Sequence, residues 1–379
     1  MRNKVYIIDP QSVNSLAAYD WNMIADIHNI DIHFFGNENY NDNAFNQNVI
    51  FTPIFKYSKY SNPFLKGFSY LLSLLIIFFY GIKERPMILH LQWLRIWILD
   101  WWFIRFFKCI LKTKFIFTVH NILPRKRNKN TFKRFHKLYE FADILIVHTQ
   151  TSKNKLEKKF QIIPEKIIVM PHGILEMKVS IEKLKEAEER LNANHIFDNK
   201  IIFGALGVQN PYKGTDLLIK AWRESSVLST AQNAILLIAG KPSGMDIPTD
   251  LPDNLLVIPR LLSNEEFKYL IDRVDVMVLP YREIEQSGVL LSLINENKPY
   301  CCTDAGELAK PIESEGIGWK IENCSETAIA QTLINILMNP TSIYEKKYNE
   351  VGWERLKDKY SWKQSNRILT NIYLKLLGK

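Results

Sequence analysis

The sequence has 379 residues, which at about 100 to 200 residues per domain predicts two domains. Apolar residues make up 47% of it and charged residues 23%, and this ordinary globular composition excludes intrinsically disordered and fibrous architectures. Its four cysteines contain no C-x-x-C pair, which excludes a disulfide scaffold and a thiolate zinc site. The apolar run after Met1 is too short for a signal peptide, so we expect a reduced, cytoplasmic protein.

The net charge of +9 is distributed unevenly. Residues 1–170 carry 24 Lys and Arg against 12 Asp and Glu, or +12, whereas the rest carries 25 against 28, or −3. Within the first half, Arg125–Lys137 has seven basic residues and no acidic one. Such a positive field attracts anionic lipid, nucleic acid or phosphorylated substrates, and a solubilising surface is the alternative.

Short apolar runs alternate with amphipathic or charged stretches, which is typical of βαβ units in a parallel sheet. The runs of the first half predict strands at Val5–Ile8, Asp31–Phe35, Val49–Phe55, Met87–Leu91, Phe115–His120, Ile144–Val147 and Ile167–Met170. Those of the second half predict strands at Ile201–Leu206, Ala234–Ala239, Leu255–Ile258, Val276–Leu279 and Tyr300–Thr303. The predicted fold class is therefore α/β with two doubly wound, Rossmann-like domains.

The polar stretch Val179–Asn192 has no strand character and separates the two series of strands. We therefore place a first domain at residues 1–185 and a second at 186–355. Beyond Glu326 the strand pattern stops and three helices are expected, the last of them from about Ser361 to Leu377. A final segment, 356–379, carries this last helix.

Two apolar stretches occur in the first half. Phe68–Ile82 is about 15 residues long, below the roughly 20 that span a bilayer, so a buried or interfacial helix is expected. Trp93–Leu111 contains four tryptophans mixed with basic residues, which suits a helix in the lipid headgroup region, although a core helix is the alternative. With the basic segment nearby, we expect docking to an anionic membrane surface. Nucleic acid is not expected, because no motif for it is present.

The segment IIFGALGVQNPYKGTDLLIKAW reads as a strand, a glycine-containing turn and a helix from about Thr215. Gly204, Gly207 and Gly214 let the backbone approach a ligand closely, and Lys213 lies at the helix N-terminus, where a phosphate can bind. The spacing excludes a dinucleotide G-x-G-x-x-G motif and a P-loop.

A second candidate site follows the strand in VDVMVLPYREIEQSGVLLSL. The strand ends at Pro280, and a helix starts after a loop that contains Glu283, Glu285, Gln286, Ser287 and Gly288. Backbone N–H groups at such a helix start can hold an anion, and the carboxylates can bind sugar hydroxyls. A capped helix after a turn, with no ligand, is the alternative.

These segments, together with TVHNILP, IVHTQTSKNKL, VMPHG, ILLIAGKP and CCTDAGE, resemble the GT-B glycosyltransferases. The similarity is to bacterial family-4-like enzymes that build capsule, O-antigen or exopolysaccharide units, and it is clearest over Ile116–Gly173 and Ile201–Trp319. The resemblance implies two facing Rossmann-like domains and a last helix that crosses back. It also implies a UDP- or GDP-linked sugar on the C-terminal domain and an acceptor on the N-terminal domain.

The resemblance assigns roles to individual residues. Lys213 matches the lysine that neutralises the diphosphate, Glu285 lies near the donor sugar, and His120 reaches the reaction centre. His172 matches a strand-end residue facing the interdomain cleft, whereas His148 is open between a structural and a functional role. The expected donor-site residues are Gly207, Asn210, Lys213, Gln286, Ser287, Gly288, Glu296 and His172.

The sequence also departs from the family pattern. The usual arginine before the lysine is Gln209 or Asn210 here, and the second of the family's paired glutamates is replaced by Ser292 or Leu293. Glu296, one helical turn further on, is a candidate replacement, and a solvent-facing Glu296 is the alternative. No metal-ligand spacing is present, and the resemblance implies no metal and no cofactor besides the nucleotide-sugar.

The expected function is transfer of a hexose from a nucleotide-sugar to a lipid-linked or membrane-proximal saccharide in surface-polysaccharide synthesis. The enzyme would be cytoplasmic and attached peripherally to the inner face of the plasma membrane. Retention of configuration follows from the resemblance alone, and inversion would need a base, for which His120 and Asp20 are candidates. A catalytically weak partner or binding subunit and a nonhydrolysing sugar-nucleotide epimerase are the alternatives.

Overall fold

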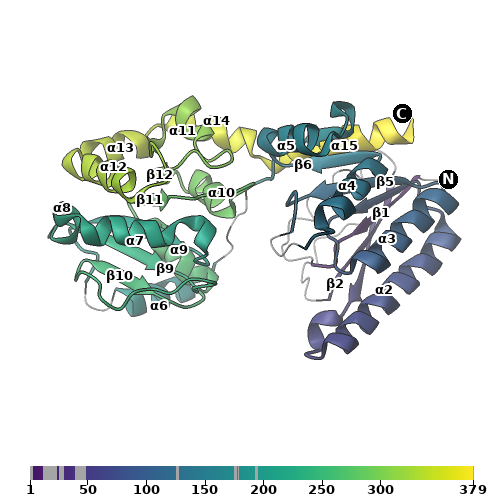
Figure 1. The fold of residues 1–379 in the computed structure, drawn as a ribbon, viewed down its shortest axis with the longest axis horizontal. Coiled ribbons are helices and arrows are strands. Elements are labelled where there is room, and N and C mark those ends of the chain that lie inside the picture. Colours follow the sequence, from purple (N-terminus) through teal and green to yellow (C-terminus); the bar gives the residue numbers. More distant parts are fainter. Residues whose placement is uncertain are drawn as a thin grey trace. The chain divides into compact units, whose positions relative to one another are not determined.

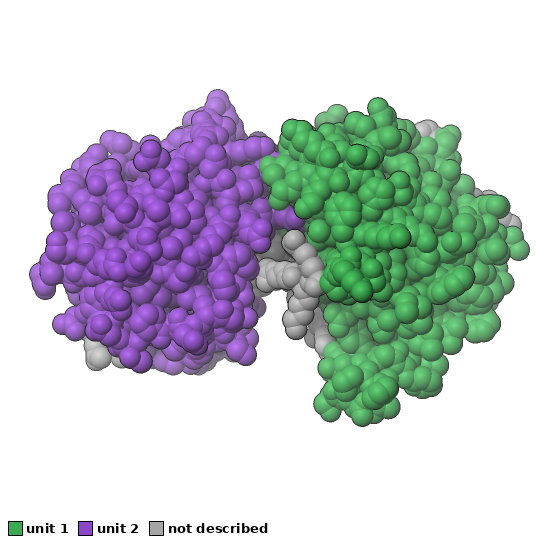
Figure 2. All heavy atoms as spheres, viewed as in Figure 1, with its two compact units in different colours: residues 1–173, 361–379 green, residues 174–360 purple. Residues whose placement is uncertain are grey.

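The computed structural model of the chain describes residues 3–11, 24, 30–38, 48–124, 128–174, 177, 179–192 and 195–378. The chain divides into two compact units, coloured separately in Figure 2. Unit 1 comprises Met1–Gly173 and Ser361–Lys379, and unit 2 comprises Ile174–Tyr360. The predicted boundaries at 185/186 and 355/356 are therefore corrected, since residues 174–185 and 356–360 belong to unit 2.

Unit 1 is built on a sheet of seven parallel strands in the order β3-β2-β1-β4-β5-β6-β7. The strands are β1 (Asn3–Ile8), β2 (Ile30–Asn37), β3 (Val49–Phe55), β4 (Ile88–Leu91), β5 (Lys114–Val119), β6 (Ile144–Val147) and β7 (Ile167–Val169). All seven predicted runs form strands, and their ends differ from the prediction by at most two residues. A parallel sheet that is covered on both faces buries consecutive side chains, so its strands appear in the sequence as continuous apolar runs.

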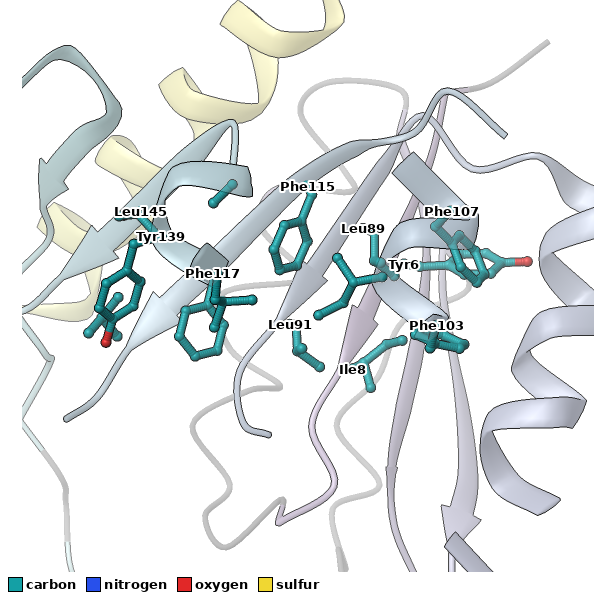
Figure 3. Packing of buried hydrophobic residues seen from close by; sticks show 14 of the residues in the cluster. Tyr6, Ile8, Leu89, Leu91, Phe103, Phe107, Phe115, Phe117, Tyr139 and Leu145 are labelled. Atoms are coloured by element: carbon teal, nitrogen blue, oxygen red, sulfur yellow. The ribbon is translucent and has the colours of Figure 1, made fainter. Parts of the chain in front are cut away.

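Alternate residues of these strands serve two hydrophobic clusters on opposite faces of the sheet. Tyr6 and Ile8 of β1 belong to the cluster in Figure 3, which also takes in helical residues such as Phe103. Val5 and Ile7 belong to the other cluster, which includes Leu369, Ile372 and Tyr373 near the C-terminus. The last helix is thus part of the unit 1 core, in agreement with the expected helix that crosses back.

The unit 1 helices lie beside the sheet in Figure 1. They are α2 (Pro63–Glu84), α3 (Trp97–Arg105), which continues into a π-helical turn (Phe106–Ile110), α4 (Thr131–Phe141), α5 (Gln150–Phe160) and α15 (Trp362–Leu377). Helix α2 has 22 residues and extends beyond the predicted Phe68–Ile82 at both ends.

The aromatic segment Trp93–Leu111 differs from the lipid-facing helix that was expected. Six of its seven Trp and Phe side chains are buried or half-buried, and Trp102 is the exposed one. Trp97 and Trp101 stack with ring centres 5.7 Å apart, and Trp101 also packs on Phe141 of α4. Most of this segment therefore serves as the domain-core helix that was the alternative.

Unit 2 has a sheet of six parallel strands in the order β10-β9-β8-β11-β12-β13. The strands are β8 (Ile201–Leu206), β9 (Ala234–Ala239), β10 (Leu255–Ile258), β11 (Val276–Leu279), β12 (Tyr300–Cys302) and β13 (Gly318–Lys320). The helices are α6 (Ile181–Leu191), α7 (Thr215–Glu224), α8 (Ser226–Ser229), α9 (Asn264–Arg273), α10 (Gly288–Asn295), α11 (Lys310–Glu315), α12 (Glu326–Met338), α13 (Thr341–Lys347) and α14 (Glu350–Lys359).

Unit 2 differs from the sequence prediction in three respects. The short strand β13 was not predicted, and four helices, α12 to α15, follow Ser325 instead of three. The predicted boundary after residue 185 divides α6 between the two domains, but the whole helix belongs to unit 2, where it packs on α9 and buries Ala187 in the core. Trp353 and Leu356 of α14 enter the same core, which keeps the chain in unit 2 as far as Tyr360.

Candidate active site

The candidate donor segments of unit 2 follow two neighbouring strands. The loop after β8 carries Gly207 and Lys213, and the loop after β11 runs from Pro280 to Ser287. Strands β8 and β11 pair directly, and between them the strand order reverses direction. In open doubly wound sheets, ligands bind at the carboxyl ends of the strands at this switch point. The two segments singled out in the sequence therefore lie together where this fold binds ligands.

Lys213 ends a 3-10 turn (Pro211–Lys213) and folds back over the end of β8. Its side chain is buried, and Nζ donates a hydrogen bond to the carbonyl oxygen of Leu206 at 3.3 Å. Nζ also lies 5.7 Å from the centre of the Tyr281 ring. A Cβ atom on Gly207, whose φ is +88°, would lie 3.3 Å from Nζ, so the glycine leaves room for the ammonium group.

The two loops touch at Gly214, the N-cap of α7. Its φ is +68°, and a Cβ atom there would lie 2.0 Å from the carbonyl oxygen of Pro280, so only glycine fits. Arg282 joins the loops further by donating two hydrogen bonds, of 2.7 and 2.6 Å, to the carboxylate of Asp216. The backbone N–H of Arg282 donates to the carbonyl of Tyr212 at 2.8 Å. The lysine turn and the β11 loop are thus held as one structure.

Gln209 and Asn210 stand where the family arginine is expected. Gln209 is fully buried: Nε2 donates to the Gly207 carbonyl at 2.7 Å, and Oε1 accepts from the Thr215 hydroxyl at 2.6 Å. Gln209 therefore stabilises the loop through buried hydrogen bonds and does not face a ligand. Asn210 is half-exposed, which leaves it as the member of the pair that can face a ligand.

The start of α10 also has the predicted form. Ser287 is the N-cap, and its hydroxyl accepts a hydrogen bond from the N–H of Leu290 at 3.2 Å. At Gly288, the first helical residue, no atom outside its chain neighbours and its own helix backbone lies within 4 Å of the place where a side chain would begin. Glu285 and Gln286 precede the cap and are half-buried. The N-terminus of this eight-residue helix is therefore open to an approaching group.

Glu296 does not join these groups, which corrects its assignment to the donor site. It is the C-cap of α10, at the other end of a helix about 12 Å long. Its carboxylate is 3.1 Å from Lys268 Nζ and accepts a hydrogen bond from the side chain of Asn295 at 2.9 Å. Ser292 is buried and its hydroxyl donates to the carbonyl of Gly288. Neither residue supplies a carboxylate at the helix start.

Unit 1 gathers four histidines near the carboxyl ends of four neighbouring strands, β4 to β7. They are His90, His120, His148 and His172. His148 Nε2 lies 3.2 Å from His120 Nδ1, and the rings of His148 and His172 meet edge to face with centres 5.4 Å apart. The three histidines considered in the sequence analysis are therefore neighbours, whereas the other candidate base, Asp20, lies outside the described residues.

The contacts of His120 place opposite requirements on its proton. His148 Nδ1 lies 3.0 Å from the carbonyl oxygen of Met170, which only accepts, so Nδ1 of His148 is protonated. In a neutral His148 the other nitrogen, Nε2, must then accept from His120 Nδ1–H. The other nitrogen of His120, Nε2, lies 3.1 Å from the Oε1 oxygen of Gln92, which only accepts, so the two contacts of His120 require its proton on different nitrogens.

Burial keeps these rings neutral at pH 7. Burial lowers the pKa of His148 to about 3, with a smaller effect from His172, and it lowers the pKa of His90 to about 3 as well. Burial, followed by the neighbouring His148, holds the pKa of His120 well below its usual range. A neutral imidazole at this position can accept a hydrogen bond or a proton but does not carry a standing positive charge.

Sequence reasoning missed the residues that surround His120. The Trp93 ring stacks on the His120 ring with centres 4.3 Å apart, and Gln92 bridges His120 to His90, whose Nε2 is 3.1 Å from the amide nitrogen. The tetrapeptide HLQW, at the end of a strand next to that of TVHN, was the available signal. The ring of His172 packs edge to face on Trp362, so the last helix, α15, holds His172 in place.

The chain thus has two doubly wound units, and unit 2 carries a buried lysine and an open helix start at its switch point. Residues 27–175 match the sequence profile of Glycosyltransferase Family 4, and residues 199–339 match that of Glycosyl transferases group 1. These matches and the fold place the chain among the GT-B glycosyltransferases. Among the described residues, no group of three or more His, Cys, Asp and Glu side chains is arranged to hold a metal ion.

A curated relative is an uncharacterized glycosyltransferase of Methanocaldococcus jannaschii, 23% identical over 285 residues. The match covers 72% of this chain and 66% of the relative, so the chain spans about two thirds of that relative's length.

Solved structures with a similar fold match nearly the whole chain. Sucrose-phosphate synthase from Thermosynechococcus elongatus has a TM-score of 0.69 at 15% identity, with 100% of both chains covered. A glycosyltransferase from Rickettsia africae has a TM-score of 0.67 at 16% identity, with 99% of both covered. HepE of Anabaena in complex with UDP and glucose has a TM-score of 0.67 at 12% identity, covering 99% of this chain and 100% of HepE.

Proposed function

We propose that this protein transfers a hexose from a UDP- or GDP-linked sugar to a lipid-linked or membrane-proximal saccharide acceptor. The proposed setting is surface-polysaccharide synthesis in a bacterium, at the cytoplasmic face of the plasma membrane, with no metal and no cofactor besides the nucleotide-sugar. The observation that carries the proposal is the buried Lys213 beside the open N-terminus of α10, at the switch point of unit 2.

The chemistry of this arrangement suits a diphosphate. A lysine ammonium and the N–H groups at the start of a helix both stabilise negative charge, which develops on the nucleoside diphosphate as it leaves. Relatives of the same fold support this class of donor, since HepE of Anabaena is described in complexes with UDP and with UDP-glucose. In this proposal Gln286, Ser287 and Gly288 contact the diphosphate or the sugar, and Glu285 binds sugar hydroxyls.

The proposed transfer retains configuration at the anomeric carbon. The bond from the anomeric carbon to the diphosphate oxygen breaks, and a bond to the acceptor oxygen forms on the same face of the sugar. The acceptor's proton passes to the departing diphosphate, which Lys213 stabilises. His120 binds near the reacting sugar in this scheme, held by His148 on Nδ1 and by Gln92 on Nε2.

A catalytically weak binding subunit is the second candidate. It is favoured by the engagement of Glu296 with Lys268 and by the interior role of Gln209, because the donor site then lacks two charged groups that the family pattern includes. A sugar-nucleotide epimerase is a third candidate, which would use the donor site without an acceptor.

One experiment separates the three. The purified protein is incubated with a panel of UDP- and GDP-sugars, with and without a polyprenyl-diphosphate saccharide, and free nucleotide and sugar identity are measured. Nucleotide release that requires the acceptor is the expected result. Donor binding without release would favour the binding subunit, and a changed sugar without release would favour the epimerase.

A further inference from the structure

Among the described residues of unit 1, helix α2 exposes more large hydrophobic side chains than any other element. Nine large hydrophobic side chains of this one helix are exposed, and Phe64 and Phe79 retain 88% and 65% of their accessible surface. The nine are Phe64, Leu65, Phe68, Leu72, Leu75, Ile76, Phe79, Tyr80 and Ile82. No charged residue occurs between Lys66 and Lys83. Isolated exposed apolar residues are ordinary, but a continuous group of this size marks an interaction surface.

The inner face of α2 shows that this helix is held on unit 1. The Tyr70 hydroxyl donates to the buried carboxylate of Asp100 at 2.5 Å, and the Ser73 hydroxyl donates to the Ile54 carbonyl at 2.9 Å. Leu74 and Ile77 are buried in the unit 1 core. By length and composition α2 could cross a membrane, but these contacts would be lost if it did. Helix α2 is therefore packed on unit 1 through its inner face, and its apolar outer face is exposed.

The apolar surface continues from α2 onto the edge of the sheet. A groove of about 620 Å³ runs between α2 and the edge strand β3, and its lining includes Pro53, Ile54, Leu72 and Ile76. On its other side α2 packs beside α3, as Figure 1 shows. This arrangement makes the surface broader than a single helix.

The charge around this surface identifies the kind of partner. Residues 48–124, which contain β3, α2 and α3, carry ten Lys and Arg but only two acidic residues. Both acidic side chains are engaged: Asp100 is buried under α2, and Glu84 pairs with Lys4 at 3.3 Å and accepts from the Tyr6 hydroxyl. A second copy of this surface would repel it, whereas an anionic bilayer offers both apolar contact and opposite charge.

We propose that α2 and the adjoining edge of β3 form the membrane-docking surface of this protein. Helix α2 lies along the boundary between lipid headgroups and acyl chains, with Phe64, Phe68 and Phe79 inserted and Lys66 and Lys83 contacting anionic headgroups. This surface replaces Trp93–Leu111, whose aromatic rings are mostly engaged within unit 1. The inference rests on the proposed membrane attachment and specifies where it occurs.

The test is co-sedimentation with vesicles of phosphatidylcholine alone and of phosphatidylcholine mixed with phosphatidylglycerol, at low and high salt. We expect binding to the anionic vesicles, weakened by salt. Replacing Phe64, Phe68 and Phe79 with Ser should raise the lipid concentration for half-maximal binding by about tenfold or more. All three side chains are exposed, so the variant should remain folded, as circular dichroism would verify.

The matched control replaces three equally exposed apolar residues of unit 2, Leu261, Met338 and Tyr344, with Ser, and binding should not change. Wild-type protein that fails to bind vesicles would contradict the proposed membrane attachment itself. Wild-type binding that survives the α2 substitutions, or is lost equally in the control, would overturn the assignment to α2. A wild-type dimer that the α2 substitutions convert to monomer in light scattering, without vesicle binding, would make this face a contact between copies.

Discussion

At the scale of single residues, the candidate donor site depends on where Lys213 is placed. The residue is weakly informative in the sequence, because lysines near glycines are common. In the folded unit its ammonium group is buried over the end of β8, beside a glycine that leaves room for it. A charge held in position before the reaction stabilises a leaving group more effectively than a mobile one, because no reorganisation is needed.

We therefore expect Lys213→Ala to lower kcat/KM for the nucleotide-sugar by on the order of 100-fold or more. The measurement is steady-state nucleotide release with the purified variant, alongside its thermal unfolding. Lys220→Ala is the matched control, since Lys220 is an exposed lysine of α7 that pairs with Glu326. Near-normal turnover in Lys213→Ala would remove this residue from the donor site.

The buried histidines of unit 1 predict a dependence of stability on pH. Burial lowers the pKa of His90 and His148 to about 3, whereas in the unfolded chain a histidine has a pKa of about 6.5. Below that value the unfolded chain takes up protons that the folded unit does not. Each of the two residues should then reduce the free energy of unfolding by about 1.4 kcal/mol for each pH unit, until the pH approaches the folded pKa.

The measurement is denaturant unfolding of the protein at pH 7 and pH 5. In His148→Asn the loss of stability between these values should be smaller, because one buried histidine has been removed. His195→Asn is the comparison, since His195 is an exposed histidine of unit 2 outside the buried cluster. Equal stability of the wild type at the two pH values would contradict the buried, neutral state of these rings.

At the scale of elements, α10 shows how a helix separates residues that are close in sequence. Its N-terminus carries Ser287 and Gly288 at the donor site, and its C-terminus carries Glu296 beside α9. The amphipathic pattern predicted a helix there but did not show that it ends at Asn295. A carboxylate at the C-cap lies near the negative end of the helix dipole, and Lys268 compensates for this by direct pairing.

We expect Glu296→Ala to leave the dissociation constant of the nucleotide-sugar unchanged within about twofold and to lower stability slightly, by about 0.5 to 1 kcal/mol. Donor affinity is measured by titration calorimetry and stability by denaturant unfolding. A double-mutant cycle with Lys268→Ala should attribute most of the stability change to the pair. A tenfold weaker affinity in Glu296→Ala would restore this residue to the donor site.

At the scale of the whole molecule, the last helix joins the two ends of the chain within unit 1. Leu369 and Ile372 of α15 are buried against β1, β2 and their neighbours, and the Tyr373 hydroxyl lies 2.7 Å from His90 Nδ1. The Ser365 hydroxyl donates to the carbonyl of Pro171 at 2.6 Å. The histidine cluster therefore depends on residues nearly 200 positions or more away in the sequence.

Shortening the buried side chains of α15 should destabilise unit 1 and leave unit 2 unchanged. Leu369→Ala and Ile372→Ala each remove a fully buried side chain, which typically costs about 2 to 5 kcal/mol. We expect the free energy of unfolding to fall for unit 1 and to stay unchanged for unit 2. Limited proteolysis measures the unfolding of each unit separately. Ile368→Ala, at a partly buried position of the same helix, should have a smaller effect. Equal destabilisation of both units would show that they do not unfold separately.

The sequence by itself determined most of the strands and helices. Twelve of the thirteen strands were predicted, because a parallel sheet covered on both faces requires short, continuous apolar runs that are visible in one dimension. The glycine and lysine loop and the start of α10 were also predicted, since glycines at turns and polar residues at helix starts follow from backbone chemistry. Only β13, with three residues, was too short to be recognised.

The tertiary structure alone decided which side chains meet and which remain exposed. It brought His90, His120, His148 and His172 together because neighbouring parallel strands end at one edge of the sheet, although the strands are far apart in sequence. It also placed the aromatic rings of Trp93–Leu111 largely inside unit 1 and left the outer face of α2 uncovered. Two apolar helices look alike in composition, and only their packing partners determine which of them faces the outside.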